Sequence, residues 1–483
     1  MKLNGLIRNL DILSLHGPAD AEVTSLASDS RQVTEGTLFV AVRGHAGDGH
    51  AYIPQALERG AAAIVCEELP ADCPADRPVL VVENSRRALA LLADAFYGHP
   101  SGKLSLVGIT GTNGKTTTVT LLYRLFSRLG YSCGLLSTIA NYVYGERLET
   151  ENTTADPITI NRLLARMVEK GCAYCFMEVS SIGVEQERVT GLRFAAGIFS
   201  NLTHDHLDYH KTFAEYLRCK KRFFDTLPKE AVALVNTDDR NAAVMVQNCR
   251  ARVVSYAVRG LADHTARILE QDVAGMLLKI DGNDVWTRLI GEHNAYNLLA
   301  VYSTAVCLGL PAEDVLVVLS WLTPAPGRLE SLRGPRDLTV VIDYAHTPDA
   351  LENVLVTLKT VARQRTLVCV FGCGGDRDRS KRPEMARVAE RMADRLVITS
   401  DNPRTEDPDA IIDEIQAGLT PAAAAKTLVI ADRREAIRTA LLTAPEGAVI
   451  LLAGKGHEEY QVVGREKRPF CEKDIVHETF RLL

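Results

Sequence analysis

A glycine-rich segment with an adjoining lysine and two threonines carries the most specific chemistry in the chain. Residues 111–117 read Gly-Thr-Asn-Gly-Lys-Thr-Thr and stand between a strand-like apolar run, residues 104–109, and a long amphipathic pattern that ends at Leu129. Backbone N–H groups of such a loop, and the N-terminus of the helix after it, can surround phosphate oxygens. Lys115 would neutralise the β- and γ-phosphates, and the Thr116 hydroxyl would face Mg²⁺. We therefore predict that ATP is bound by Gly111, Thr112, Asn113, Gly114, Lys115, Thr116 and Thr117.

This loop departs from the strict phosphate-loop pattern, which would place a glycine at position 109. Ile109 stands there, and the upstream glycine is Gly108. A glycine-rich turn with a helix cap would account for Gly111 and Gly114, but it gives no reason for the Lys-Thr-Thr that follows. A variant nucleotide-binding loop is the prediction.

Three further polar segments follow in the central part of the chain. Glu178 comes directly after an apolar run, so it should lie at the carboxyl end of a strand, where a carboxylate can hold Mg²⁺. Residues 204–210 contain three histidines among aspartates, and without the nucleotide loop they would be read as a hydrogen-bonded loop. Lys220 belongs to a basic run, residues 216–222, whose composition alone indicates a solvated helix face.

The elements that must position these residues form an α/β pattern in three parts. At about 150 residues per domain, 483 residues suggest three domains. We predict a domain at 1–103, a central domain with a mainly parallel sheet at 104–330, and a doubly wound, Rossmann-like domain at 331–483. The strand-like runs that support this division are residues 38–42, 61–66, 79–82, 104–109, 174–179, 195–199, 231–235, 338–342, 366–371, 395–399, 427–430 and 448–452.

Composition limits the classes of partner and the compartment. The formal net charge is −6, so no global positive field exists to attract nucleic acid or anionic lipid. No apolar run reaches signal-peptide length near the first residue or the ~20 residues of a membrane span later. The eleven cysteines are odd in number and lie in apolar stretches, which suits reduced thiols. We expect a cytoplasmic protein without nucleic-acid partners or membrane insertion.

Three motifs together resemble the Mur ligase family, whose members use ATP to join an amino acid to a carboxylate. They are residues 111–117, Glu178-Val-Ser-Ser, and Asn201-Leu-Thr-His-Asp-His-Leu-Asp. The resemblance extends over essentially all three domains. It is strongest to the third enzyme of the family, which adds diaminopimelate or lysine to UDP-N-acetylmuramoyl-L-alanyl-D-glutamate. It implies a monomeric ligase of peptidoglycan synthesis, and so of cell shape and division, that acts on small molecules through an acyl phosphate.

The resemblance also assigns roles around the nucleotide. It selects His206 over His204 and His210 as the second metal position, and Lys220 over Lys221 as a lysine carried as a carbamate. A carbamate turns an ammonium donor into an anionic oxygen ligand, which would help to place Mg²⁺. The implied catalytic residues are Lys115, Glu178, His206 and Lys220, the metal ligands are Thr116, Glu178, His206 and carbamylated Lys220, and further ATP contacts are Asn297, Arg328 and Asp343.

Two sets of residues match the family's acceptor site. Hydroxyl side chains and exposed amides in residues 28–31 and 44–49 suit a uridine diphosphate, although two ordinary turns would look alike. Arg188 suits a carboxylate because its planar fork can bind two oxygens. The UDP-precursor site implied by the resemblance comprises Ser28, Ser30, His45, Ala46, Gly47, Asn152, Thr153, Thr154, Ser180, Gln186 and Arg188.

The segment Asp401-Asn402-Pro403-Arg404 bears on the choice of amino acid. It follows a strand-like run, so it should lie at the carboxyl edge of the third sheet, where ligands collect. Diaminopimelate differs from lysine by a second carboxylate, and Arg404 supplies a fixed cation for it while Asn402 can hydrogen-bond the distal group. A turn that caps the next helix is the alternative. The implied diaminopimelate contacts are Arg377, Asp401, Asn402, Pro403, Arg404, Gly454 and Glu458.

Three other functions stay open at this point. A lysine-adding ligase of the same fold would lack a cation opposite the distal end of its substrate. A folate polyglutamate ligase would share the ATP chemistry but would not require residues 28–31 or the Asp-Asn-Pro-Arg segment. A nucleotide-gated regulatory protein would bind ATP without forming an amide, and it would leave the amino-acid pocket unexplained.

Overall fold

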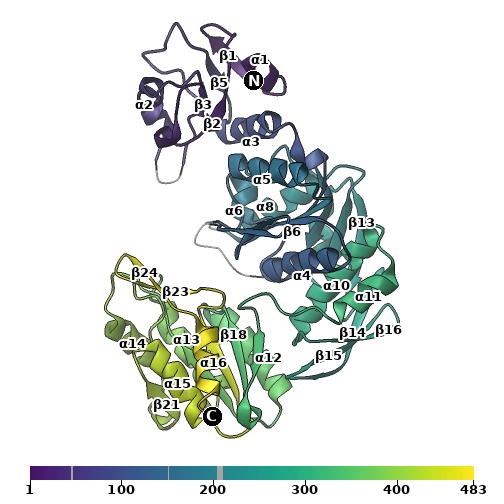
Figure 1. Cartoon of the computed structure of the whole chain (residues 1–483), viewed down its shortest axis with the longest axis vertical. Helices are drawn as coiled ribbons and strands as arrows, with labels where there is room; N and C mark the ends of the chain where they lie inside the picture. Colours follow the sequence, from purple (N-terminus) through teal and green to yellow (C-terminus); the bar gives the residue numbers. More distant parts are fainter. Residues whose placement is uncertain (45–46, 151, 204–209, 211) are drawn as a thin grey trace. The chain divides into compact units, whose positions relative to one another are not determined.

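The computed structural model describes residues 1–44, 47–150, 152–203, 210 and 212–483. These residues form two compact units, Met1–His264 with Ser303–Leu310, and Thr265–Tyr302 with Pro311–Leu483. Figure 1 follows the chain through both units by colour. Among the described residues, no helix has both the length and the apolar character needed to cross a membrane.

The first unit begins with a small five-stranded sheet in the order β1-β5-β4-β3-β2, parallel except for β1. Alternate strand residues face opposite sides, so Val40 and Val65 pack with α3 on one face while Phe39 and Ile64 pack with α2 on the other. The elements are α1 (Leu3–Leu6), β1 (Ile12–His16), β2 (Ser25–Ala27), β3 (Thr37–Val40), α2 (Ile53–Glu58), β4 (Ala63–Cys66), β5 (Val79–Val82) and α3 (Ser85–Phe96).

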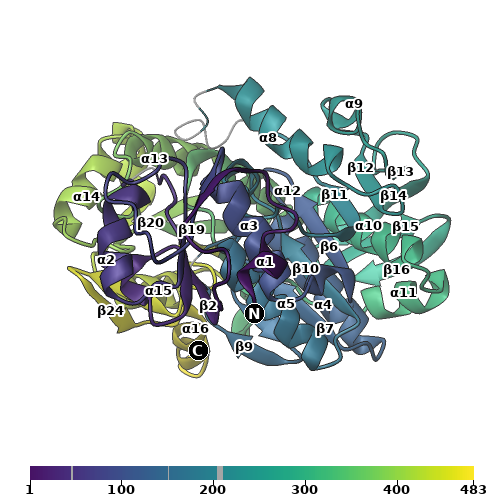
Figure 2. The same ribbon diagram turned by 90° about the horizontal axis from the view of Figure 1, so that it is seen from above.

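A second sheet of this unit carries the glycine-rich loop. Its strands run parallel in the order β13-β12-β11-β6-β10-β7, and β8 and β9 extend it antiparallel. Helix α4 packs on β6, β7 and β10 (Figure 2). The strands are β6 (Ser105–Thr110), β7 (Cys133–Leu136), β8 (Asn141–Val143), β9 (Glu146–Leu148), β10 (Tyr174–Glu178), β11 (Phe194–Phe199), β12 (Val232–Asn236) and β13 (Arg252–Ala257); the helices are α4 (Lys115–Arg128), α5 (Pro157–Glu169), α6 (Ser181–Glu185), α8 (Phe213–Asp225) and α9 (Ala242–Met245).

The order of these strands explains why distant motifs meet. Strand β6 lies between β10 and β11, and all three run in the same direction. Their carboxyl ends therefore share one edge of the sheet, which brings the segments after residues 110, 178 and 199 together.

The chain continues with an antiparallel ladder and two helices, most of whose residues belong to the second unit: β14 (His264–Asp272), β15 (Gly275–Ile280), β16 (Asn283–Thr287), α10 (Glu292–Cys307) and α11 (Ala312–Leu319). A six-stranded sheet follows in the order β17-β18-β22-β19-β20-β21, parallel except for β17. Its strands are β17 (Glu330–Arg333), β18 (Thr339–Asp343), β19 (Leu367–Phe371), β20 (Arg395–Ile398), β21 (Thr427–Val429) and β22 (Val449–Ala453).

Helices cover both faces of this sheet. Val341 and Leu451 pack with one group of helices, whereas Val340 and Leu452, one residue along each strand, pack with the other. The first group is α12 (Pro348–Ala362), α13 (Lys381–Met392) and α14 (Pro408–Gln416), and the second is α15 (Arg433–Thr443) and α16 (Glu472–Phe480). A hairpin of β23 (Tyr460–Val463) and β24 (Glu466–Pro469) stands apart from the sheet.

The predicted fold class is confirmed. The three regions hold α/β sheets, the central sheet is mainly parallel, and the last is doubly wound. The boundaries at 103/104 and 330/331 stay predictions. All eleven cysteines lie in the described part of the chain and are free thiols.

Candidate active site

The glycine-rich loop forms the N-terminal approach to α4. Gly111 has φ +154° and Gly114 has φ +88°, backbone conformations that side chains rarely adopt. The Lys115 Nζ donates to the carbonyl oxygens of Gly111 and Thr112, each at 2.8 Å. The N-cap residue of α4 is Gly114, which has no side chain to cap the first turn. The N-terminus of a helix presents backbone N–H groups that suit a phosphate.

The loop is also tied to the segment after β11. The backbone N–H groups of Thr112 and Asn113 donate to Asn201, at 2.9 Å to its carbonyl oxygen and 2.9 Å to its Oδ1. A Cβ atom at Gly111 would lie only 1.9 Å from the Ser200 Oγ. Glycine at position 111 thus allows the two segments to approach this closely.

Gly111→Ala is expected to raise the KM for ATP at least about tenfold, because relieving the clash with Ser200 must shift the loop. Gly130→Ala is the matched control. Gly130, just beyond the end of α4, also has a positive φ, +89°, but among the described residues no atom other than those of its chain neighbours lies within 4 Å of its Cβ position. Steady-state kinetics with varied ATP would contradict this account of the loop if the two variants gave the same KM.

Glu178 lies beside the loop at the end of β10. Its side chain is buried, Oε2 accepts from the Thr116 hydroxyl at 3.0 Å, and Oε1 accepts from the Thr138 backbone N–H at 2.8 Å. No lysine or arginine of the described residues forms an ion pair with it. A buried carboxylate next to a hydroxyl at a phosphate loop is a set of hard oxygen ligands that fits Mg²⁺.

Lys220 reaches the same loop from α8, and it is buried rather than solvated. Its Nζ donates to the Gly111 carbonyl oxygen at 2.8 Å and lies 4.6 Å from the centre of the Tyr216 ring. Lys221 points elsewhere and pairs with Asp225 at 2.6 Å. The geometry therefore distinguishes two adjacent lysines that composition could not separate.

Lys115 and Lys220 share one acceptor, the Gly111 carbonyl oxygen. Two ammonium groups this close to one acceptor repel each other, and a carbamate at one of them would replace that repulsion with attraction. The arrangement is chemically suited to the modification expected at Lys220.

The predicted peptide-binding residues gather around Thr154. Its hydroxyl donates to the Glu178 carbonyl oxygen at 2.9 Å and accepts from the Ser180 backbone N–H at 3.0 Å. Arg188 donates to the Thr154 carbonyl oxygen at 2.5 Å and to the Gln186 Oε1 at 2.7 Å. Thr153 hydrogen-bonds Thr138, whereas Asn152 is exposed. Thr154 and Ser180 thus lie at the end of the strand that carries Glu178, and Arg188 and Gln186 are linked to that end by hydrogen bonds through Thr154.

The predicted uridine-nucleotide residues lie on two turns of the first sheet. The Ser30 hydroxyl is buried and donates to the Gln55 Oε1 at 2.7 Å, while Ser28 is exposed. The Gly47 carbonyl oxygen accepts from the Gly44 N–H at 2.9 Å. His45 and Ala46, and also His206 with its alternative His204, lie outside the described residues. His210, the other alternative, is buried and hydrogen-bonds the Ser181 Oγ at 2.9 Å.

In the second unit, two of the three predicted ATP contacts are neighbours. The Asp343 carboxylate is buried at the end of β18 and accepts from the backbone N–H groups of Leu329 and Ala345. Burial raises the pKa of Asp343, and the Arg328 guanidinium opposes that rise. Arg328 lies over the Tyr344 ring at 5.0 Å. Asn297, on α10, donates to the Asn294 Oδ1 at 3.0 Å.

The predicted amino-acid pocket is built around Asn402, after β20. Its Oδ1 accepts from the Lys455 Nζ and the Val462 N–H, each at 2.9 Å, so its Nδ2 faces Glu458 and donates to Oε2 at 2.8 Å. Lys455 is fully buried and lies 3.3 Å from carboxylate oxygens of both Asp401 and Glu458. The amide orientation follows from these contacts.

Arg404 lies two residues after Asn402 on the same segment. Its backbone has φ +51°, its N–H donates to the Val462 carbonyl oxygen, and its own carbonyl oxygen accepts from Gly464. The Arg404 Nη1 donates to the Gly375 carbonyl oxygen at 2.7 Å. A Cβ atom at Gly454 would lie 2.6 Å from the Asp401 Oδ2, so that loop also needs glycine. Arg377 is exposed on the turn that contains Gly375.

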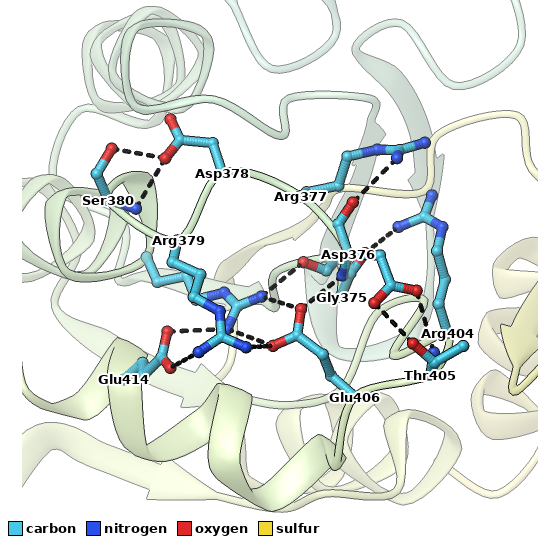
Figure 3. Close-up of polar contacts among 12 residues, drawn as sticks. Gly375, Asp376, Arg377, Asp378, Arg379, Ser380, Arg404, Thr405, Glu406 and Glu414 are labelled. Atoms are coloured by element: carbon cyan, nitrogen blue, oxygen red, sulfur yellow. Dashed lines mark hydrogen bonds and ion pairs between the residues drawn. The ribbon is translucent and has the colours of Figure 1, made fainter.

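An ion-pair network underlies the Asp401–Arg404 turn, as Figure 3 shows around Glu406. The Glu406 carboxylate accepts from the Asp376 N–H at 2.5 Å and from Arg382 at 2.9 Å, and it pairs with Arg379 at 2.9 Å. The hydrogen bond from Arg382 is the main reason that the pKa of Glu406 is lowered to about 2.

The lowered pKa predicts a pH-dependent contribution of Glu406 to stability. Because the folded-state pKa lies below the ordinary 4.5, the contribution is complete above pH 4.5 and disappears as the pH falls toward 2. Denaturation midpoints of the wild type and Glu406→Gln should therefore differ most near neutral pH and converge in acid. Glu384→Gln, at an exposed site on α13, is the control. A difference that stays constant from pH 7 to pH 3 would contradict the assignment.

Comparison with known proteins identifies the family of the chain. It is 51% identical, over all of both chains, to UDP-N-acetylmuramoyl-L-alanyl-D-glutamate--2,6-diaminopimelate ligase of Bacteroides fragilis. The chain belongs to the Mur ligase family. A protein of the same name from Cytophaga hutchinsonii is 49% identical to this Mur ligase, again over all of both chains.

The family match covers each region of this Mur ligase. Residues 22–97 match the model described as Mur ligase family, catalytic domain, residues 109–305 the Mur ligase middle domain, and residues 327–456 the Mur ligase, glutamate ligase domain. A solved structure of UDP-N-acetylmuramoyl-L-alanyl-D-glutamate--2,6-diaminopimelate ligase aligns with a TM-score of 0.73 at 30% identity. That alignment covers 100% of this chain and 99% of the other.

Several residues at these sites escaped prediction from the sequence. Tyr216 contacts Lys220 through its ring and shares a 3.1 Å hydrogen bond with Thr112, and Lys455 binds the amide of Asn402. The β23 hairpin contributes Val462. Lys455 lies between Gly454 and Glu458, so its place in that glycine-rich motif was the available signal.

Proposed function

We infer that this Mur ligase adds meso-diaminopimelate to the D-glutamyl γ-carboxylate of UDP-N-acetylmuramoyl-L-alanyl-D-glutamate, with ATP converted to ADP and phosphate, in peptidoglycan synthesis. The observation that carries this inference is the segment after β20, where the Asn402 amide donates to Glu458 and the Arg404 guanidinium donates to the Gly375 carbonyl oxygen. Relatives of about 50% identity over the full length bear the name of this enzyme.

The chemistry begins with activation, because a carboxylate is a poor electrophile. An oxygen of the γ-carboxylate attacks the γ-phosphorus of ATP, which forms an acyl phosphate and releases ADP. The Lys115 ammonium, at the N-terminus of α4, neutralises charge on the phosphoryl group as it transfers. Positioning of the two reactants accounts for much of the remaining rate.

Amide formation follows when the diaminopimelate amine attacks the acyl carbonyl carbon. The tetrahedral intermediate then expels phosphate, and the nitrogen loses a proton. We assign Glu458 and the Asn402 amide to the polar groups at one end of the amino acid, and Arg404 to the carboxylate that lysine lacks; the bonds that hold Asn402 and Arg404 support this assignment. Arg377, Asp401, Pro403 and Gly454 are assigned to the same pocket.

We assign Mg²⁺ to Thr116 and Glu178, with His206 and carbamylated Lys220 as the expected further ligands. When bound, the ion neutralises phosphate charge. The protein residues fix where the oxygens lie: Glu178 is held by Thr116 and by the Thr138 N–H. The buried Lys220 next to the Gly111 carbonyl supports the carbamate.

Further residues are assigned to the uridine nucleotide, the muramoyl peptide and ATP. The uridine nucleotide is bound by Ser28, Ser30 and residues 45–47, and the muramoyl peptide by Thr154, Ser180 and Arg188 with their neighbours. Asn297, Arg328 and Asp343 contact ATP. We propose a cytoplasmic monomer with three domains divided at residues 103 and 330.

A coupled assay of ADP release tests the reaction class. ADP should form over many turnovers only when ATP, Mg²⁺, the UDP-muramoyl dipeptide and diaminopimelate are all present, because amide formation is the step that consumes the acyl phosphate. ATP hydrolysis that ignores both acceptors would instead favour a nucleotide-gated regulatory protein. Folate monoglutamate with glutamate serves as a negative control for the related acceptor chemistry.

A further inference from the structure

Two turns of the second unit approach each other more closely than side chains would allow. After β19, residues 372–375 run beside residues 399–403, which follow β20. A Cβ atom at Gly372 would lie 2.3 Å from the Thr399 carbonyl oxygen, and one at Gly375 would lie 1.9 Å from the Pro403 carbonyl oxygen. The glycine-rich turn therefore forms the surface against which the Asp401–Arg404 turn is placed.

Arg404 rests directly on this glycine-rich turn. Its Nη1 donates to the Gly375 carbonyl oxygen at 2.7 Å and would lie 2.9 Å from a Cβ atom at Gly374. Asp376 and Arg404 both have left-handed backbone conformations, with φ of +53° and +51°. Such backbone conformations are strained in residues other than glycine and persist only when surrounding contacts hold them.

The holding contacts converge on Arg382, at the start of α13. Its side chain is fully buried, and Nη2 donates to the Gly374 carbonyl oxygen at 3.2 Å, one residue before the carbonyl that binds Arg404. The same guanidinium pairs with Glu406 at 2.9 Å and with Glu414 of α14 at 2.8 Å. Arg382 thus connects the glycine-rich turn, the turn after Arg404 and a helix.

Glu406 links the two turns a second time (Figure 3). While paired with Arg382, it accepts from the Asp376 N–H, and the Asp376 carboxylate accepts from the Thr405 hydroxyl at 2.8 Å. Removing Arg382 would leave the Glu406 and Glu414 carboxylates with Arg379 as their shared cationic partner in place of two arginines. Their repulsion would act on the residues that flank Arg404.

We propose that Arg382 is a positioning residue for diaminopimelate selection: it holds residues 374–376 and 404–406 so that the Arg404 guanidinium faces the substrate's distal carboxylate. This inference rests on the proposed function. Arg382 itself does not contact substrate. It acts through the Gly374 carbonyl and through Glu406.

Arg379 provides a matched control for this inference. It pairs with the same two carboxylates, Glu406 at 2.9 Å and Glu414 at 3.4 Å, but its side chain is 64% exposed. It makes no contact with the Gly374 carbonyl among the described residues. Arg379→Met removes the same charge from the network without removing the buried link.

The test measures KM and kcat of the full-length wild type, Arg382→Met, Arg382→Lys and Arg379→Met, with diaminopimelate and with lysine. Arg382→Met is expected to raise the KM for diaminopimelate about tenfold and to leave the KM for ATP within about twofold. Its kcat/KM for lysine should not change, because lysine has no distal carboxylate. Arg382→Lys should recover part of the loss, and Arg379→Met should resemble the wild type.

Other outcomes are equally decisive. Equal losses with diaminopimelate, lysine and ATP would show a merely structural role, and wild-type KM values for Arg382→Met would remove the inference. If Arg382→Met does not fold, Arg382→Lys and Glu414→Gln carry the same comparison. A wild type that forms no diaminopimelate amide would refute the proposed function itself, which separates that failure from a failure of this inference.

Discussion

Lys220→Ala is expected to lower kcat about a thousandfold, which corresponds to about 4 kcal/mol of transition-state stabilisation. The substitution removes the proposed carbamate and with it an anionic oxygen ligand near the transferring phosphoryl group. It also removes the hydrogen bond from Nζ to the Gly111 carbonyl oxygen. Turnover measured as ADP release, with all substrates saturating, reports the loss.

A small carboxylate added to Lys220→Ala tests the chemical nature of the missing group. Formate or acetate can occupy the vacated volume and present an anionic oxygen, so part of the activity should return. Lys115→Ala lacks a cation instead, so the same additives should not help it. Lys221→Ala is the control, since Lys221 pairs with Asp225 away from the loop. Wild-type activity in Lys220→Ala would remove the assignment.

Arg404→Ala is expected to raise the KM for diaminopimelate about a hundredfold while the KM for ATP stays within about twofold. A bidentate guanidinium–carboxylate contact contributes charge-assisted hydrogen bonds of about 1.5–3 kcal/mol each. Alanine keeps the backbone hydrogen bonds that Arg404 makes to Val462 and Gly464. The loss therefore reports the guanidinium rather than the turn.

Arg468→Ala is the control for the Arg404 variant, because Arg468 is an exposed arginine on β24, in the hairpin that the Arg404 backbone bonds through Val462 and Gly464. It should leave both KM values unchanged. An equal rise of the two KM values in Arg404→Ala would point to a structural role. It would favour the alternative interpretation, in which the Asp-Asn-Pro-Arg segment is a turn that caps the next helix.

The elements with strong apolar periodicity were predictable from the sequence. Strand β6, the loop at 111–117 and α4 were recognisable because a buried parallel strand is a continuous apolar run and the glycines mark the turn. The doubly wound sheet followed from the regular spacing of its strands. Glu178 was predictable because a polar residue ends such a strand.

The short antiparallel elements were not predictable in the same way. Strand β24 reads Glu-Lys-Arg-Pro and is exposed throughout, so no hydrophobic pattern marks it. Its hairpin partner β23 nevertheless supplies the Val462 N–H that orients Asn402. Local composition cannot show a contact that depends on a turn about 60 residues earlier in the chain.

The burial of individual charged residues was also not predictable from the sequence. The basic run at 216–222 indicated a solvated face, but Lys220 is buried because its Nζ finds a carbonyl oxygen 109 residues away. Arg382 belongs to a similar charged run and is buried by carboxylates 24 and 32 residues distant. Such partners become visible only when the fold brings them together. Resemblance to a family, rather than residue pattern, singled out Lys220.

The mass of the nucleotide product tests the central claim most directly. Purified protein would receive ATP, Mg²⁺ and UDP-N-acetylmuramoyl-L-alanyl-D-glutamate, with diaminopimelate and lysine in separate reactions and then together at equal concentration. We predict the diaminopimelate adduct in the first and the mixed reaction, with little lysine product. Preferential formation of the lysine adduct would contradict the role given to Arg404, and no adduct with either amino acid would contradict the ligase assignment.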